Sequence, residues 1–230
     1  MNYNKWDKIF EEIVNDLDLD KNQDISSAKY LEKRLKTYPH TKSVSVLKPF
    51  LYKQDIFIFG AGPSLEKTLL NYQDSIKKST SIAADGATSA FIKNDIKPDI
   101  IITDLDGFIP DQIKANEKGS IVVVHAHSDN IKTLREKLLY FQGSLIGSTQ
   151  SNPDLFDLLF NVGGFTDGDR AIYIADHFQA KTISLIGFDC LGPIGKYSYA
   201  EKKDKKRKKQ KLKWCDQLIK KIDNKSIVFL

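Results

Sequence analysis

The stretch that most constrains the fold lies near the middle of the chain, at residues 97–107. It reads KPDIIITDLDG, an uncharged run of isoleucines that leads into Asp104, Asp106 and Gly107. Uncharged β-branched runs are typical of a strand that is buried on both faces of a parallel sheet. If the backbone stays extended as far as Asp106, both carboxylates project to the same side, and Gly107 lets the chain turn away behind them.

Two acidic residues at a strand end suit a divalent cation. Magnesium is typically held by one or two protein carboxylates, and water and substrate phosphate oxygens complete its octahedron. The sequence therefore predicts a Mg²⁺ site at Asp104 and Asp106 in an enzyme that uses a nucleotide. The pattern alone leaves open the competing interpretation that both residues are solvated turn formers.

Further βα units surround this strand. Strands are expected at residues 56–59, 80–84, 100–103, 121–124, 144–147 and 183–186, with helical patterns between them. Such units in succession predict an α/β, Rossmann-like fold with a mostly parallel sheet and helices on both faces. Ligands bind at the carboxyl ends of the strands in such sheets. Gly60, Asp85, Asp104 and His125 all fall at these ends, so we expect a binding site there.

Helical patterns are also found outside the βα units. Apolar spacing predicts a helix over residues 3–19, and a second helix is expected to be capped by Ser26 or Ser27. Pro153 is expected to begin a helix that includes Leu159. We expect the chain to divide into an N-terminal helical segment (1–54), an α/β catalytic core (55–200) and a lysine-rich C-terminal segment with a final helix and strand (201–230).

Composition excludes several classes of protein. No apolar run reaches membrane-spanning length and the polar start has no signal-peptide core, so we expect a cytoplasmic protein without a membrane partner. Cys190 and Cys215 lie in dissimilar contexts and form no CxxC, so neither a disulfide framework nor a thiolate metal site is indicated. The net charge of +5 is concentrated in residues 202–213.

A glycine-rich turn follows the first expected strand. Backbone N–H groups at such a strand-to-helix turn can bind phosphate, but Leu65 stands where a dinucleotide fingerprint has its third glycine, and no Lys-Ser/Thr pair follows. A phosphate cradle and a tight connection are therefore both open interpretations. The candidate phosphate-binding residues are Gly60, Ala61, Gly62, Pro63 and Ser64.

The motif HAHSDN follows the fourth expected strand. In an extended segment His125, His127 and Asp129 share one face, a spacing that could hold zinc. Because no cysteine or fourth ligand accompanies them, polar contacts to a ligand are the preferred interpretation, and these contacts include Asn130.

The motif GGFTDGDR precedes another apolar helix. Thr166 or Asp167 could simply cap that helix, but two acids and an arginine exceed what a cap needs. Asp167 and Asp169 could bind a metal or an N–H-rich heterocycle, and Arg170 suits a phosphate or a planar ring.

Taken in order, these motifs resemble those of the archaeal 6-hydroxymethyl-7,8-dihydropterin pyrophosphokinases. They are GAGPSL, ADGA, PDIIITDLDG, HAHSDN, GGFTDGDRA and IGFD, and they span residues 60–189. Each motif is weak, but the ordered set is specific, and part of it resembles thiamine pyrophosphokinases more distantly. Phe188 departs from the pattern, because a small or flexible apolar residue is expected there.

The resemblance implies transfer of pyrophosphate from ATP to the hydroxymethyl group of a reduced pterin, with release of AMP, in folate or methanopterin biosynthesis. Mg²⁺ on Asp104 and Asp106, with Asp85 as a further ligand, would neutralise charge on the transferring phosphates. A general base is not identifiable. The residues assigned together to the pterin and the metal shell are His125, His127, Asp129, Asn130, Thr166, Asp167, Asp169 and Arg170.

The lysine-rich run admits two interpretations. It is either a solvated helix that extends toward Trp214, or part of a flap over residues 197–211 that closes on the ATP phosphates through lysines such as Lys205 and Lys208.

Two other functions remain as alternatives. The same fold and DxD could serve a glycosyltransferase that uses a nucleotide sugar. A non-catalytic nucleotide or nucleic-acid-binding module would need aromatic residues among the lysines, and residues 202–213 contain none, so nucleic acid is not an expected partner. The sequence leaves a homo-oligomer open.

Overall fold

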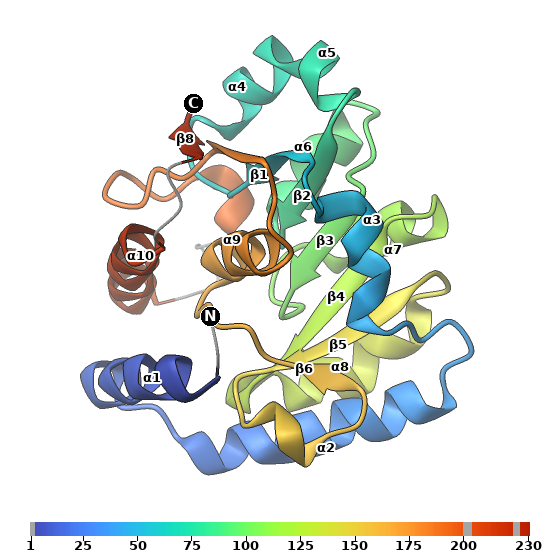
Figure 1. The fold of residues 1–230 in the computed structure, drawn as a ribbon, viewed down its shortest axis with the longest axis vertical. Coiled ribbons are helices and arrows are strands. Elements are labelled where there is room, and N and C mark those ends of the chain that lie inside the picture. The colour runs from blue at the N-terminus through green and yellow to red at the C-terminus, as the bar shows by residue number, and fades with distance from the viewer. Residues whose placement is uncertain (1–2, 200–203, 223–225) are drawn as a thin grey trace.

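A computed structural model describes residues 3–199, 204–222 and 226–230, and a parallel sheet lies at its centre (Figure 1). Within these residues the sheet has eight strands in the order β6-β5-β4-β3-β2-β1-β7-β8. The strands are β1 (Asp55–Phe59), β2 (Thr80–Ala84), β3 (Ile100–Thr103), β4 (Ile121–Ala126), β5 (Leu145–Thr149), β6 (Leu159–Phe160), β7 (Thr182–Ile186) and β8 (Ile227–Phe229). Each neighbouring pair is parallel. The expected α/β, Rossmann-like fold is confirmed.

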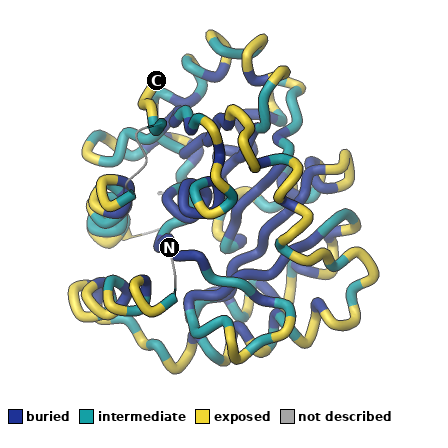
Figure 2. The backbone as a smooth tube through the Cα atoms, viewed as in Figure 1, coloured by how far each residue is buried: buried dark blue, intermediate teal, exposed yellow. Residues whose placement is uncertain are grey.

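Strand β3 is buried on both faces, as its composition predicts. Ile100 and Ile102 pack into one apolar cluster, and Ile101 packs into another on the opposite face. Successive side chains of a strand point to opposite faces, so this alternation places helices on both sides of the sheet. Figure 2 shows the same arrangement, with the strands buried and the outer surfaces of the helices exposed.

Two layers of helices cover the sheet. The helices are α1 (Tyr3–Leu17), α2 (Lys21–Thr37), α3 (Lys48–Leu51), α4 (Leu65–Asn71), α5 (Gln73–Ile76), α6 (Ala87–Lys93), α7 (Ile109–Glu117), α8 (Ile131–Lys137), α9 (Asp167–His177) and α10 (Lys205–Lys220). Short 3₁₀ turns are η1 (Val44–Leu47), η2 (Ser128–Asn130), η3 (Leu138–Tyr140), η4 (Pro153–Leu155) and η5 (Lys196–Ser198). One layer contains α1, α3, α9 and α10, and the other contains α2, α4, α6, α7 and α8 (Figure 1).

Two expectations about helices are wrong. Asp20, not Ser26 or Ser27, caps α2, because its side chain accepts a hydrogen bond from the Asn22 N–H and the helix begins nearly two turns earlier than expected. Pro153 begins only the single 3₁₀ turn η4. The chain then becomes extended, and Leu159 pairs with β5 as part of the short strand β6.

The order of the strands reverses beside β1. Strands β2 to β6 lie on one side of β1, and β7 and β8 lie on the other. The loops after β1 and β7 therefore lie together at the carboxyl edge of the sheet, where α/β proteins bind ligands. Glycines allow this approach, because a Cβ on Gly60 would lie 2.7 Å from the carbonyl oxygen of Gly187, which itself has a φ of +74°.

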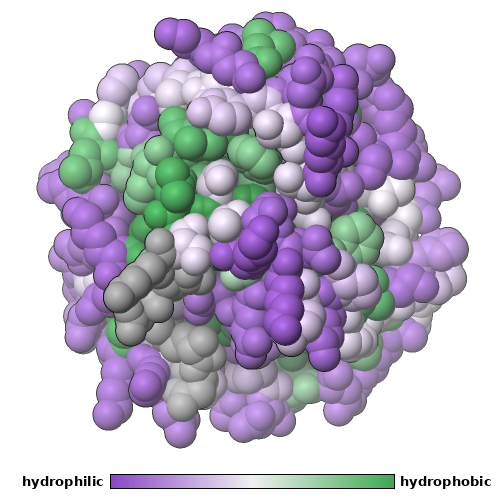
Figure 3. Space-filling model, turned by 45° about the horizontal axis from the view of Figure 1, so that its top comes forward, coloured by the Kyte–Doolittle hydropathy of each residue, from purple (hydrophilic) through white to green (hydrophobic). Residues whose placement is uncertain are grey.

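The surface is mostly hydrophilic, with an apolar area on the face that Figure 3 brings forward. The edge strand β8 exposes Val228 and Phe229. Within the described residues, none of the helices has the length and apolar character that a bilayer crossing requires.

The N-terminal helix α1 belongs to the same apolar cluster as α9 and α10. Trp6 is 1% exposed, stacks on Phe10 with ring centroids 5.9 Å apart, and meets the edge of Tyr173 at 6.2 Å. The division of the chain at residues 54 and 200 stays a prediction, but α1 contributes to the core of the molecule.

Replacing Trp6 by alanine tests this contribution. We expect the free energy of unfolding to fall by about 3 kcal/mol, because a large buried ring is lost. This loss lies at the low end of the range for replacing a buried tryptophan by alanine. The buried Nε1–H of Trp6 has no hydrogen-bond partner among the described residues, so its removal loses no hydrogen bond. Denaturant titration would measure it, with Leu139→Ala as a control at an exposed position. A loss no larger than that of the control would contradict a core role for α1.

Candidate active site

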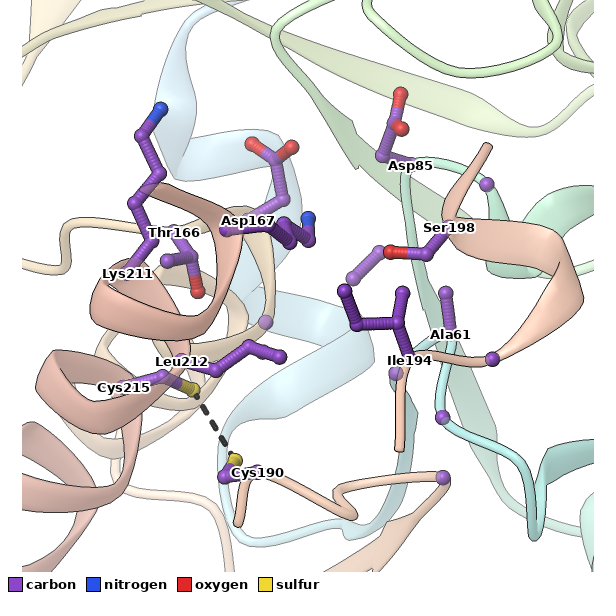
Figure 4. A pocket seen from close by; sticks show the side chains of 18 of the residues that line it. Ala61, Asp85, Thr166, Asp167, Cys190, Ile194, Ser198, Lys211, Leu212 and Cys215 are labelled. Carbon is purple, nitrogen blue, oxygen red and sulfur yellow. Dashed lines mark hydrogen bonds between the residues drawn. The ribbon is translucent and has the colours of Figure 1, made fainter. Parts of the chain in front are cut away.

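A cavity of about 360 Å³ opens where the order of the strands reverses. Its walls come from the loops after β1, β2, β3 and β7, the first turn of α9, the segment 193–198 and one face of α10. Figure 4 shows side chains from these elements around a common space. Segments that are far apart in sequence therefore form one site.

Three carboxylates meet at one end of this cavity. Asp85 follows β2, Asp104 follows β3 and Asp167 begins α9, and one oxygen of each lies within 4.8 Å of the others. In the described part of the chain, they are the one group of three or more His, Cys, Asp or Glu side chains that comes this close. An all-oxygen group of this kind suits a hard divalent cation such as Mg²⁺.

Asp85 is held in place by its neighbours. Its Oδ1 accepts hydrogen bonds from Thr103 Oγ1 at 2.8 Å, Gln112 Nε2 at 2.8 Å and the Gly107 N–H at 3.1 Å. A Cβ on Gly107 would meet both carboxylate oxygens of Asp85. Gly107 is thus needed for close packing against Asp85.

The expected extended geometry of Asp104 and Asp106 is wrong. Strand β3 ends at Thr103, and Leu105 has a φ of +66° because its N–H turns back to donate to Thr103 Oγ1 at 2.8 Å. Asp106 is exposed at the cavity wall, and its N–H donates to Asp104 Oδ1 at 3.1 Å. The backbone of Asp106 therefore orients Asp104, and a metal-ligand role for its carboxylate stays a prediction.

Residues of the HAHSDN motif contact Asp104 and fix its position. His127 Nε2 lies 3.1 Å from Asp104 Oδ2. Asn130 Nδ2 donates to the carbonyl oxygens of Asp104 at 2.9 Å and His125 at 2.7 Å, and its Oδ1 accepts from the His127 N–H. Asn130 therefore ties the ends of β3 and β4 together.

His125 is buried under this motif and does not reach the cavity. Its Nδ1 lies 3.0 Å from Ser148 Oγ, and burial lowers the pKa of its imidazole well below the ordinary value. Within the described residues, neither His125 nor His127 belongs to a group of three ligating side chains. The side chain of Asp129 lies outside the part that the structure describes.

Polar residues in the first turn of α9 either cap the helix or bind Asp167. Asp169 accepts hydrogen bonds from the backbone N–H of Phe165 and from the N–H and hydroxyl of Thr166, so it completes a capping box. Arg170 is 3% exposed, and its Nη1 donates to Asp167 Oδ1 at 2.8 Å. Asp169 and Arg170 therefore position Asp167 rather than line the cavity.

Asp167 is the acid most affected by this environment. Burial raises the pKa of its carboxyl well above the ordinary value and nearby Asp104 raises it further, whereas Arg170 opposes the rise. A divalent cation among the three carboxylates would favour their ionised forms, because it offsets both the desolvation and the repulsion.

The glycine-rich turn is largely engaged by the loop after β7. The N–H groups of Gly60 and Gly62 donate to the carbonyl oxygens of Ile186 at 2.8 Å and Gly187 at 2.9 Å. The N–H and hydroxyl of Ser64 donate to Asp189 Oδ2 at 3.0 and 2.8 Å. These bonds account for the close fit of the turn, and its phosphate contacts stay a prediction.

The wall at residues 193–198 is anchored to α4. The carboxylate of Glu66 binds Lys196, accepts from Tyr197 Oη at 3.2 Å and contacts Lys93 at 2.5 Å. Lys196, followed by Lys93, lowers the pKa of Glu66 to about 2. Glu66 therefore stays ionised and can hold this wall in place at any ordinary pH.

The predicted site residues divide into two sets. Those that line the cavity are Gly60, Ala61, Gly62, Asp85, Asp104, Asp106, Thr166, Asp167 and Lys208. The other predicted residues whose side chains the structure describes are outside its lining: Pro63, Ser64, His125, His127, Asn130, Asp169, Arg170 and Lys205. The lysine-rich run is confirmed as helical over Lys205–Lys220, whereas Lys202 and Lys203 lie outside the described residues.

Sequence reasoning missed two parts of the site. Arg207 and Lys211 fall within the expected flap over residues 197–211 but are not singled out by sequence reasoning; they line the cavity beside Lys208, and their helical spacing on α10 is the signal that could have found them. Phe188 also lines it, because Gly60 and Gly168 leave space for its ring, to which a Cβ on either glycine would come within 3.0–3.3 Å. This packing explains how a large side chain fits where a smaller one is expected.

Replacing Gly107 by alanine should disturb the carboxylates through Asp85, which is the residue closest to an added Cβ. We expect Mn²⁺ affinity, measured by isothermal titration calorimetry, to fall by about tenfold or more, because the added methyl group displaces a carboxylate. Gly192→Ala is the matched control, since a Cβ there would make only ordinary contacts of 3.4 Å and longer. Equal Mn²⁺ affinity in both variants would show that the position of Asp85 is not needed for the cation.

Comparison with known proteins places the chain in a family. Residues 29–193 match the family model described as 6-hydroxymethylpterin diphosphokinase MptE-like. A 6-hydroxymethyl-7,8-dihydropterin pyrophosphokinase of Methanothermobacter thermautotrophicus is 41% identical over 193 residues, which are 84% of this chain and 81% of that protein. The Pyrococcus furiosus protein of the same name is 37% identical over 228 residues, which are 97% and 95% of the two chains.

A solved structure supports the fold alone. The Maf glycosyltransferase from Magnetospirillum magneticum AMB-1 superposes with a TM-score of 0.50 at 16% identity over 74% of this chain. The match spans only 28% of that larger enzyme. Together with the family model and the two archaeal relatives, the architecture leads to one assignment: the chain belongs to the MptE-like 6-hydroxymethylpterin diphosphokinase family.

Proposed function

We propose that the protein transfers the pyrophosphoryl group of ATP to the hydroxymethyl group of 6-hydroxymethyl-7,8-dihydropterin, giving AMP and the pterin diphosphate. Membership of the family and the names of the relatives support this reaction. The observation that carries it is the presence, in one cavity, of the Asp85, Asp104 and Asp167 cluster and of the cationic face of α10.

The carboxylate cluster fits Mg²⁺ by the chemistry of its donors. Asp85 and Asp104 are fixed by hydrogen bonds from β3, α7 and the HAHSDN motif, and Asp167 is fixed by Arg170. When bound, Mg²⁺ would supply positive charge to the phosphate oxygens as the phosphoryl bond breaks. Three carboxylates without a cation would repel ATP, so the cluster fits the substrate only with the metal.

Arg207, Lys208 and Lys211 supply the complementary charge from the protein itself. Arginine can bind two phosphate oxygens at once, and lysine contributes a compact point charge. Their place opposite an acidic cluster would align the triphosphate and neutralise the charge of the AMP that leaves. Lys205 lies outside the cavity lining, so we assign the phosphate contact on α10 to Lys208 and its two neighbours on the same face.

Part of the cavity wall is apolar. Phe188, Pro193, Ile194 and Leu212 line it on the side of the β7 loop and α10. Such walls suit the faces of a planar heterocycle, whose edges would be bound by polar groups. Attack by a hydroxyl on phosphorus depends mainly on alignment, so a cavity that holds both substrates in order can account for most of the catalysis.

Replacing Asp104 by asparagine tests the proposed function. We expect kcat to fall by roughly a hundredfold or more while the fold is kept, because the variant loses the charge that positions the cation. Phosphorus NMR with ATP, Mg²⁺ and the pterin would follow the loss of ATP and the appearance of AMP and a pterin diphosphate. Asp106→Asn should have a smaller effect, and Asp74→Asn, at an exposed carboxylate on α5, should have none.

Two results would contradict the proposal. Near-normal turnover by Asp104→Asn at saturating Mg²⁺ would rule out the metal site. Turnover of nucleotide sugars, with none of ATP and pterin, would instead support the glycosyltransferase alternative.

The cationic face of α10 gives an independent prediction. Arg207→Gln with Lys208→Gln should raise KM for ATP by about a hundredfold or more, since each charge-assisted contact contributes about 1.5–3 kcal/mol. Lys206→Gln with Lys209→Gln removes the same charge from residues outside the cavity lining and should change KM little. A salt series separates the two pairs, because only contacts within the cavity resist screening at a Debye length of about 8 Å. Equal increases in KM for the two double variants would show that the net charge of α10, and not contacts within the cavity, determines the KM for ATP.

A further inference from the structure

Two cysteines meet at the cavity wall, although nothing in their sequence contexts indicates a pair. Cys190 lies in the loop after β7 and Cys215 lies on α10, and their Sγ atoms are 3.7 Å apart (Figure 4). Both residues line the cavity. The two thiols therefore lie where the wall formed by the β7 loop meets the wall formed by α10, to which Leu212 belongs.

We propose that Cys190 and Cys215 form a reversible disulfide that joins the β7 loop to α10 and narrows the apolar side of the cavity. The present separation is a van der Waals contact, and a disulfide needs about 2.05 Å between the sulfurs. Closing this gap would take rotation of the two side chains and a shift of the loop. No other chain segment has to move out of the way, because the sulfurs already touch.

The environments of the two thiols give them different roles. Cys190 is half-buried and Cys215 is 2% exposed. Contact with Cys215 lowers the pKa of the Cys190 thiol, whereas that contact and burial raise the pKa of Cys215 well above its ordinary value. Cys190 is therefore the thiol that a dissolved reagent reaches first and that reacts as a thiolate.

The oxidant is a low-molecular-weight disulfide, R–S–S–R. The Cys190 thiolate attacks one sulfur, so that a Cys190–S–S–R bond forms and R–S⁻ leaves. The Cys215 thiolate then attacks the Cys190 sulfur and expels the second R–S⁻. The two protons released by the cysteines go to the two R–S⁻ ions, and two electrons pass from the cysteine pair to the reagent, which leaves as two R–SH.

The bond would act on the cavity through α10. Cys215 lies on the same face of this helix as Arg207, Lys208 and Lys211. Toward its C-terminal end the helix is held in the core by Leu218 and Ile219. A disulfide at Cys215 would draw the adjacent Leu212 toward the β7 loop and leave less room for a ring. Formation of the disulfide does not depend on the proposed function. Its expected effect on ATP binding does rest on that function.

The test uses the full chain and oxidised glutathione. After incubation, quenching in acid, denaturation and alkylation with iodoacetamide, we expect an intact mass that is lighter by two hydrogens and carries no alkyl group. The thermal midpoint should rise by about 5 °C or more and return on reduction with dithiothreitol, since closing a loop restricts the unfolded chain. Two alkylated cysteines, or a glutathione adduct that persists, would overturn the proposal.

Two variants separate the roles of the thiols. Cys215→Ser should stop at a glutathione adduct on Cys190, whereas Cys190→Ser should leave Cys215 unreactive until the protein unfolds. Cys215→Ala serves in place of Cys215→Ser if the buried hydroxyl prevents folding. Rapid modification of Cys215 in the Cys190→Ser variant would contradict the assigned order of attack.

Calorimetry with ATP and Mg²⁺ measures how the disulfide changes ATP binding in the cavity. The oxidised protein should bind ATP several-fold more weakly than the reduced protein. An unchanged Kd in a protein shown by mass to be fully oxidised would reject the narrowing but not the proposed enzyme. A reduced protein that binds no ATP would instead count against the proposed function.

Discussion

The close contact between the loops after β1 and β7 is the constraint on which the site depends. At Gly60 and Gly187 the two backbones approach more closely than any side chain would allow. This contact lets Gly62 and Ser64 bond to the β7 loop and brings that loop, with Phe188 and Cys190, to the edge where β2 and β3 present their carboxylates. Backbone packing at one point thus helps to bring together residues from the loops after β1, β2, β3 and β7.

The carboxylate cluster shows how a fold can keep like charges together. Each acid is held by donors from a different element: Thr103 and Gln112 for Asp85, His127 and Asn130 around Asp104, and Arg170 for Asp167. Hydrogen bonds of this kind stabilise the charged form of a carboxylate and limit its movement. The repulsion that remains is then available to bind a cation, because the protein cannot relieve it by moving the side chains apart.

The sequence predicts the sheet better than the site. Uncharged runs such as Ile100–Ile102 identify the buried strands because burial on both faces leaves a local pattern. The carboxylate cluster depends on Asp167, which is more than 60 positions from Asp104, and no local pattern shows that α9 begins beside β3. The extended geometry expected for Asp106 fails for a local reason, the Thr103 hydroxyl that turns the chain at Leu105. Arg207, Lys211 and the Cys190–Cys215 contact likewise depend on where α10 packs.

The place of α9 in the chain has a consequence for how the site is assembled during synthesis. Asp85 and Asp104 emerge together with β2 and β3, but Asp167 and Arg170 follow only after β4, β5 and β6. Domains grow from the N-terminus on the ribosome, and contacts between distant segments form late. A nascent chain that ends before α9 therefore has only two of the three carboxylates and should bind divalent cations weakly. If the cluster holds a cation as proposed, its site would be complete only once α9 has joined β2 and β3.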